Sequence, residues 1–289
     1  MLAASGRVVY DKRPVSDFSA CFLLIFGQMA VGGMLALAVP PFAVVERGFF
    51  KSTAAVFLGC ALLFLAGRID LVVRRGDAFT APGTLAELGA WTAFAAALAR
   101  YLWTLWGEAG ARVARAYVAT LASGAVALVA TALTHRPALL PGAGHLLYVP
   151  AFVTGALTLG GVATGLSLGH WYLIDLGLSL APLKRLFRFF VVCVVLHLAV
   201  LALTAAAAGT LSSAGATAVA TLWHDYRALL LTRLLFGPVA ALALAYLIHR
   251  TLQIPQTMAA TGLFYIAILA VMVGELLGRL ILFRTTLPL

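Results

Sequence analysis

Long apolar runs, separated by short polar breaks, follow one another along nearly the whole chain. A helix needs about 20 mostly apolar residues to cross the hydrocarbon core of a bilayer. Eight runs approach or exceed that length, and the breaks between them are rich in Pro, Gly and Arg, so each run is predicted to be one membrane-spanning helix. The predicted spans are residues 18–39, 53–69, 84–106, 113–134, 147–174, 187–208, 228–249 and 257–283.

The composition agrees with a surface that lies mostly in lipid. Hydrophobic residues make up 63% of the 289 residues and charged residues only 10%, whereas a soluble domain carries about 25% charged residues. We therefore expect an all-α polytopic membrane protein, in which residues 1–289 form a single bundle of about eight transmembrane helices. An even number of crossings places both termini on the same side of the membrane.

The basic residues point to membrane surfaces rather than to nucleic acid. The net charge is +10, but the Lys and Arg residues stand in short clusters between the apolar runs, as at 12–13, 74–75 and 184–188. Such clusters are typical of anchors that contact anionic lipid headgroups. They also offer a surface on which a soluble partner can dock.

The cysteines give no sign of a metal site. Cys21, Cys60 and Cys193 each lie inside an apolar run, and no CxxC motif or Cys/His cluster is present. We interpret them as small apolar side chains. If iron–sulfur chemistry is involved, another subunit must carry the clusters.

The last run contains two charged residues near its end. Glu275 and Arg279 stand four positions apart, so they share one face of a helix in the favourable order. Gly274 and Gly278 form a GxxxG motif that allows another helix to approach closely. Glu275 and Arg279 are interpreted either as a structural pair or as groups beside a polar ligand or a proton path, because charges in a bilayer need partners.

The fifth run carries glycines at a helical spacing. Gly161, Gly165 and Gly169 repeat every four residues, which makes one smooth face on a helix. Such faces allow helices to pack closely in membranes. We predict that this ridge lies against another helix rather than against lipid.

Other polar residues in the runs have alternative interpretations. His170 and Gln28 are candidates either for ligand binding or for packing, and His170 with His197 could supply the two axial ligands of a haem b. That pairing requires the fifth helix to continue toward residue 180. Glu87 and Arg233 lie near run ends, where long side chains reach water, so the sequence predicts no special role for them.

The two ends of the chain resemble one family. The segment FGQMAVGG at residues 26–33 resembles the first helix of membrane-anchor subunits of the dimethyl sulfoxide reductase and polysulfide reductase type. The segment GELLGR at residues 274–279, with Leu282-Phe283, resembles the close of their eighth helix. The resemblance covers only these terminal segments, and it agrees with the chain length and the predicted number of helices.

The resemblance implies a multi-pass subunit of the cell inner membrane that oxidises or reduces a quinone, either menaquinone or ubiquinone. Electrons would pass to or from an iron–sulfur subunit and a catalytic redox subunit of a respiratory complex. The candidate residues by chemical type are Glu275 and His170 for the proton and hydrogen-bond chemistry, and Gln28, His170 and Arg279 for holding the quinone. The alternatives are a haem-b electron-transfer subunit and a structural subunit of a large membrane complex.

Overall fold

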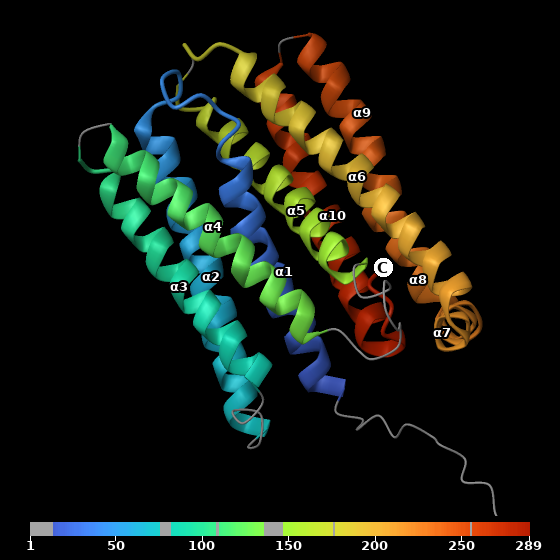
Figure 1. The fold of residues 1–289 in the computed structure, drawn as a ribbon. Coiled ribbons are helices and arrows are strands. Elements are labelled where there is room, and N and C mark those ends of the chain that lie inside the picture. Colours follow the sequence, from blue (N-terminus) through green and yellow to red (C-terminus); the bar gives the residue numbers. More distant parts are fainter. Residues whose placement is uncertain (1–13, 76–81, 108–109, 136–146, 176, 255) are drawn as a thin grey trace, which may run out of the picture.

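The fold is a bundle of long helices (Figure 1), which we describe from a computed structural model. The structure describes residues 14–75, 82–107, 110–135, 147–175, 177–254 and 256–289. The elements are α1 (Pro14–Ala36), α2 (Arg47–Arg75), α3 (Pro82–Thr104), α4 (Ala111–Thr134), α5 (Tyr148–Trp171), α6 (Ala181–Leu211), α7 (Ser213–His224), α8 (Arg227–Leu234), the π-helical turn η3 (Leu235–Val239), α9 (Ala240–Gln253) and α10 (Thr257–Thr285).

The predicted all-α polytopic architecture is confirmed. Each of the eight predicted runs coincides with a helix, and within the described residues seven spans are long and apolar enough to cross a membrane. The run that does not reach this standard is α3, which contains Glu87 and Arg100. It nevertheless packs along α2 and α4 as a full member of the bundle.

Successive long helices run in opposite directions through the bundle (Figure 1). The start of α1 and the end of α10 therefore lie at the same end, which we call the lower end because it is lower in Figure 1. The turn from α3 to α4 and the turn from α5 to α6 lie at the opposite, upper end. This arrangement agrees with the prediction that both termini lie on one side of the membrane.

Helices α1 and α5 form the centre of the bundle. The apolar span of α5 is 78% buried and that of α1 is 67% buried, whereas that of α2 is only 28% buried. The two central backbones touch, because a Cβ added to Gly160 would lie 1.9 Å from the carbonyl carbon of Gly32. A side chain at either position would force the central helices apart.

The predicted glycine ridge of α5 does face other helices. A Cβ added to Gly165 would lie 2.5 Å from the Phe264 ring, and one added to Gly169 would lie 2.7 Å from the Thr261 hydroxyl, both on α10. Gly161 instead faces α6, with Phe190 at 3.5 Å. The ridge therefore lets α6 and α10 pack closely on the central helix.

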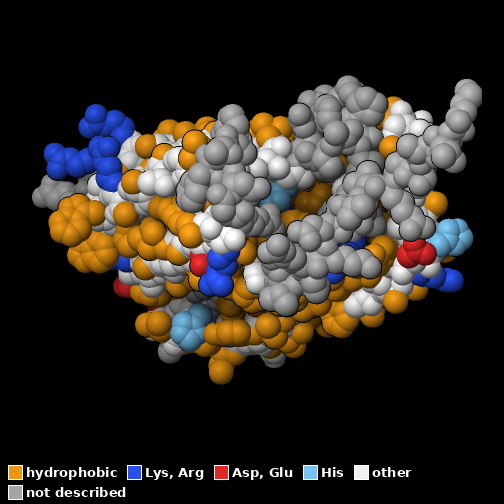
Figure 2. All heavy atoms as spheres, turned by 90° about the horizontal axis from the view of Figure 1, so that it is seen from below, with side chains coloured by type: hydrophobic (Ala, Val, Ile, Leu, Met, Phe, Trp, Pro, Cys, Tyr) orange, Lys and Arg blue, Asp and Glu red, His pale blue; other side chains and the backbone are white. Residues whose placement is uncertain are grey.

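The outer faces of the bundle carry large exposed apolar side chains, as a lipid-facing surface requires. Examples are Val56 on α2, Val126 on α4, Val195 on α6 and Leu247 on α9, all at least 46% exposed. Seen from the lower end, hydrophobic side chains dominate the outline, and charged side chains appear at a few separate places (Figure 2).

The seventh predicted run is a helix with an irregular turn. It comprises α8, η3 and α9, and Pro238 lies inside η3. Proline has no N–H and its ring collides with the preceding turn, which breaks the regular α-helical hydrogen bonding. The short helix α7, which connects α6 to α8 at the lower end, was not predicted.

Candidate functional site

A buried carboxylate from α10 holds together a network of polar side chains. Glu275 is 2% exposed. Its Oε1 accepts a hydrogen bond from Arg233 Nη2 of α8 at 2.8 Å and lies 2.9 Å from His197 Nε2 of α6. Its Oε2 accepts a hydrogen bond from Arg279 Nη2 at 3.1 Å. One carboxylate thus joins three of the helices, and we call the group around it the Glu275 cluster.

Arg279 extends the Glu275 cluster to the central helices. Its Nε donates to Gln28 Oε1 of α1 at 3.0 Å, and Gln28 Nε2 donates to the Phe152 carbonyl of α5 at 2.9 Å. The guanidinium carbon also lies 4.2 Å from the centre of the Phe152 ring, a cation–π contact. The two terminal motifs of the sequence therefore meet through side-chain hydrogen bonds inside the membrane domain.

The protonation state of His197 determines which neighbour its Nε2 can hydrogen-bond. Thr154 Oγ1 donates its hydrogen to the Pro150 carbonyl at 2.8 Å, so at 2.9 Å it accepts from His197 Nδ1. Nε2 lies 3.0 Å from Arg233 Nη2, which only donates, and 2.9 Å from the Glu275 carboxylate, which only accepts. Neutral His197 therefore pairs with Arg233, and protonated His197 pairs with Glu275.

Glycines make the space that these charged groups occupy. A Cβ on Gly155 of α5 would lie 2.7 Å from Glu275 Oε2. A Cβ on Gly237 of η3 would lie 2.0 Å from Arg233 Nη1, and a Cβ on Gly274 would lie 2.5 Å from the Gly237 Cα. The expected close approach is confirmed at Gly274, which meets η3, whereas Gly278 faces the Leu289 carbonyl and the Arg233 side chain.

The Glu275 cluster contains more basic than acidic groups. Arg233 and Arg279 share the single carboxylate of Glu275, and Arg233 Nε has no hydrogen-bond partner among the described residues. A buried charge without full compensation costs several kcal/mol. The cluster therefore contains one guanidinium that the carboxylate does not neutralise.

A small cavity adjoins this excess charge. Its volume is about 10 Å³, which is room for about one water molecule. Its polar lining consists of His197, Arg233, Glu275 and Thr158, whose hydroxyl donates to the Thr154 carbonyl. The other walls come from α6, η3, α9 and α10: Val194, Leu198, Gly237, Pro238, Ala241 and Val271.

The structure does not bring His170 into the Glu275 cluster. His170 is exposed at the upper end of α5, with Nδ1 3.5 Å from the Tyr265 hydroxyl. Gly155, which faces Glu275, lies 15 positions earlier on the same helix, a rise of about 22 Å. His170 and Glu275 therefore do not share one site.

The two histidines considered for a haem do not fit one. Helix α5 ends at Trp171 and does not continue toward residue 180. His197 contacts Thr154, which lies about 24 Å along the helix axis from His170. Axial ligands of one haem must face each other across a single ring, so His170 and His197 cannot serve together. Within the part of the chain that the structure describes, no three His, Cys, Asp or Glu side chains gather as metal ligands.

The prediction for Arg233 was wrong, because its side chain is 3% exposed and enters the core instead of reaching water. A sequence signal for this position does exist. A charge inside an apolar run requires a partner, and Gly237 stands four residues later, where it leaves room for the guanidinium.

Glu87 is likewise buried, with an exposed fraction of 0%. It accepts hydrogen bonds from Arg68 of α2, the shorter at 2.9 Å, and its Oε1 has no partner among the described residues. This second carboxylate–guanidinium pair joins α2 to α3, apart from the Glu275 cluster.

Comparison of the chain with protein-family models, with curated proteins and with solved structures finds no match in any of the three. The family resemblance therefore depends on the two terminal motifs alone.

Proposed function

We propose that the chain is a quinone- or quinol-interacting subunit of a respiratory oxidoreductase in the inner membrane, acting on menaquinone or ubiquinone. One observation carries the proposal. Gln28 and the pair Glu275 and Arg279, which belong to the two motifs of the family resemblance, hydrogen-bond to one another although they lie at opposite ends of the chain. A buried polar group beside apolar walls suits a ligand that is apolar except for its redox ring.

A bound quinone supplies two-electron, two-proton chemistry, and the protein must then move protons. His197 Nε2 is the acceptor in this proposal, because it lines the cavity and lies between Arg233 and Glu275. When His197 is neutral, Nε2 accepts from Arg233. When it gains a proton, Nε2 donates to Glu275, so the carboxylate stabilises the new positive charge.

The size of the cavity determines how a proton reaches His197. A space of about 10 Å³ accepts a water but no quinone ring. The ring would therefore lie outside this cavity, and a water inside the cavity would connect it to His197 Nε2. Arg233 and Arg279 keep Glu275 ionised by donating to it, and Gln28 holds Arg279 in position.

Electrons must leave through other subunits in this proposal, because the three cysteines are scattered and buried. The partners are an iron–sulfur subunit and a catalytic redox subunit. Lys184, Arg185 and Arg188 are exposed near the upper start of α6 and offer a basic surface for docking.

Glu275→Gln tests the proposal in the assembled complex. We expect quinol-linked turnover to fall at least tenfold, a loss within the usual range for a proton-transfer group. Glu87→Gln is the matched control, since Glu87 is also buried and bound to an arginine but lies in another pair. Its turnover should stay near wild type.

A second variant tests whether proton transfer, rather than hydrogen bonding within the Glu275 cluster, supports turnover. His197→Gln keeps a hydrogen-bonding amide that cannot carry the proton, and we expect a comparable loss of turnover. If the complex with His197→Gln or Glu275→Gln assembles and turns over at the wild-type rate, the proposed proton path is wrong.

A structural role is the competing proposal, and the number of helices joined by the Glu275 cluster supports it. Both proposals allow the two variants to lower stability, so turnover per assembled complex separates them: under a purely structural role it stays at the wild-type value.

A further inference from the structure

A groove at the upper end of the bundle, remote from the Glu275 cluster, has the chemistry of a ligand site. Two cavities of about 350 Å³ and 780 Å³ adjoin there, and both include Gly110 and Val113 in their lining. Binding sites for small molecules commonly have volumes of about 300–1,000 Å³. We call the combined space the upper groove.

The inner part of the upper groove is apolar apart from tyrosines. Leu37, Phe42 and Phe50 form much of its wall. Tyr101 also lines it, is 3% exposed, and its hydroxyl has no hydrogen-bond partner among the described residues. Tyr117 differs, because its hydroxyl already donates to the Met34 carbonyl. A tyrosine hydroxyl that lines an apolar groove can donate to the carbonyl of a ligand.

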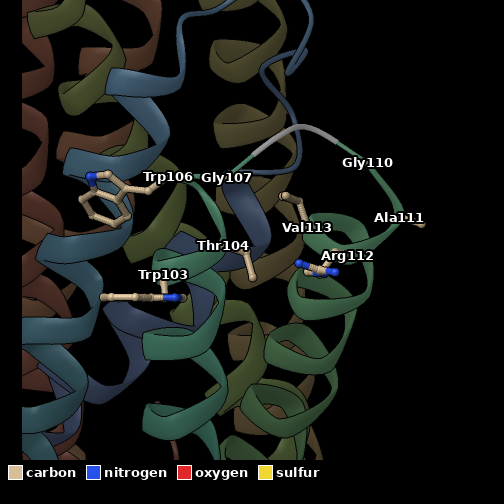
Figure 3. A pocket seen from close by; sticks show the side chains of 8 residues that line it. All are labelled: Trp103, Thr104, Trp106, Gly107, Gly110, Ala111, Arg112 and Val113. Atoms are coloured by element: carbon tan, nitrogen blue, oxygen red, sulfur yellow. The ribbon is translucent and has the colours of Figure 1, made fainter.

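Among the described residues that line the outer part of the upper groove, the only charged one is basic. Arg112 lines it from the first turn of α4 and forms no ion pair with any described residue. Gly110 is the N-cap of α4 and has no side chain that could cap the first amide groups of that helix. Free amides at a helix start favour an anion. Figure 3 shows the Arg112 and Thr104 side chains between α3 and α4, beneath the turn.

The surroundings match the interface between lipid tails and headgroups. Trp103 is 81% exposed and Trp106 is 64% exposed, as tryptophans of an interfacial belt are. Lys51 Nζ lies 4.8 Å from the centre of a Trp106 ring, and Arg47 donates to the Gly107 carbonyl at 2.5 Å. Arg47 and Lys51, in the first turns of α2, thus contact the residues that follow α3 and add positive charge beside the groove.

We propose that the upper groove binds an anionic glycerophospholipid. An acyl chain occupies the apolar inner part, an ester carbonyl accepts from Tyr101, and the phosphate contacts Arg112 and the start of α4. The charge complementarity identifies the occupant, because a neutral apolar molecule would leave the basic outer part unused. This inference does not rest on the proposed function.

Native mass spectrometry of the purified full chain in detergent tests the proposal. The probes are phosphatidylglycerol and phosphatidylcholine with identical acyl chains. We expect tighter binding of phosphatidylglycerol and an about fivefold weakening in Arg112→Gln, the usual effect of one basic residue at a lipid surface. Arg115→Gln is the matched control, since Arg115 is exposed one turn later on α4 and does not line the groove. Its effect should stay below about twofold, because charges without direct contact are screened.

The apolar part is tested separately. Tyr101→Phe removes only the hydroxyl and should weaken both lipids about fivefold, as the loss of one hydrogen bond does. Tyr246→Phe, at an exposed position on α9, should change neither. Ala114→Phe places a ring in the groove and should displace both lipids.

Equal binding of the two lipids would overturn the proposal, as would equal effects of Arg112→Gln and Arg115→Gln. Unchanged binding in both Tyr101→Phe and Ala114→Phe would show that the lipid sits elsewhere.

Discussion

Removing Glu275 should destabilise the protein more than removing Arg233, although the two side chains bind each other. Among the described residues, Glu275 is the only carboxylate in contact with two buried guanidiniums, so Glu275→Gln leaves both without that counter-charge. Loss of one partner from a buried ion pair costs about 3–5 kcal/mol. We expect Glu275→Gln to lower the free energy of unfolding by that amount.

Arg233→Met has two opposing effects on the free energy of unfolding. It removes a charge-assisted hydrogen bond of 2.8 Å, worth about 1.5–3 kcal/mol. It also removes the guanidinium whose Nε has no partner among the described residues, and Glu275 keeps its bond to Arg279. The net loss should therefore be only about 1–2 kcal/mol, below that of Glu275→Gln.

Unfolding in mixed micelles by titration with a denaturing detergent measures these differences. The double variant Glu275→Gln/Arg233→Met is the decisive sample, because residues in contact do not act additively. It should be more stable than Glu275→Gln alone, since only one unpaired cation remains. A double variant that loses the sum of the two single effects would refute the idea of an excess buried charge.

Three further expectations follow from the packing and the topology. Gly165→Leu should lower stability by about 1–3 kcal/mol in the same assay, because the added side chain meets Phe264, while Gly59→Leu, with open space around it, should be near neutral. Tags at the two termini should report the same compartment in an accessibility assay, and opposite compartments would contradict the topology. The isolated chain should show no quinol-linked turnover until the iron–sulfur and catalytic subunits are added. Full activity without them would contradict the proposal that electrons pass to those subunits.

The helices were predictable because membrane insertion imposes a strong local rule. A segment in the hydrocarbon core must satisfy its own backbone hydrogen bonds and present apolar side chains, so each crossing is visible as a run of sequence. The runs ending near residues 39, 134 and 283 correspond closely to α1, α4 and α10. The rule does not distinguish a continuous helix from one with a π-helical turn, and η3 was therefore missed.

The candidate site was predictable only in part. Gln28, Glu275 and Arg279 stood out because polar groups are expensive in lipid and because their motifs resemble a known family. The same reasoning favoured His170 as a site residue and considered His197 only as a haem ligand, although both lie in or near apolar runs. Helical periodicity describes the face of one helix, and it does not specify which neighbour covers that face or at what depth.

Tertiary structure decided those neighbours through backbone contacts. The approach of Gly32 to Gly160 brings α1 against α5, and the approach of Gly237 to Gly274 brings η3 against α10. The second contact places Arg233 beside Glu275, and the packing of α6 on Gly161 of α5 brings His197 there, whereas His170 stays at the exposed upper end. The sequence alone determined which segments enter the membrane, because that depends on each segment's own apolarity. Which polar groups meet inside depends on how closely pairs of helices can pack, and that is a property of two segments at once.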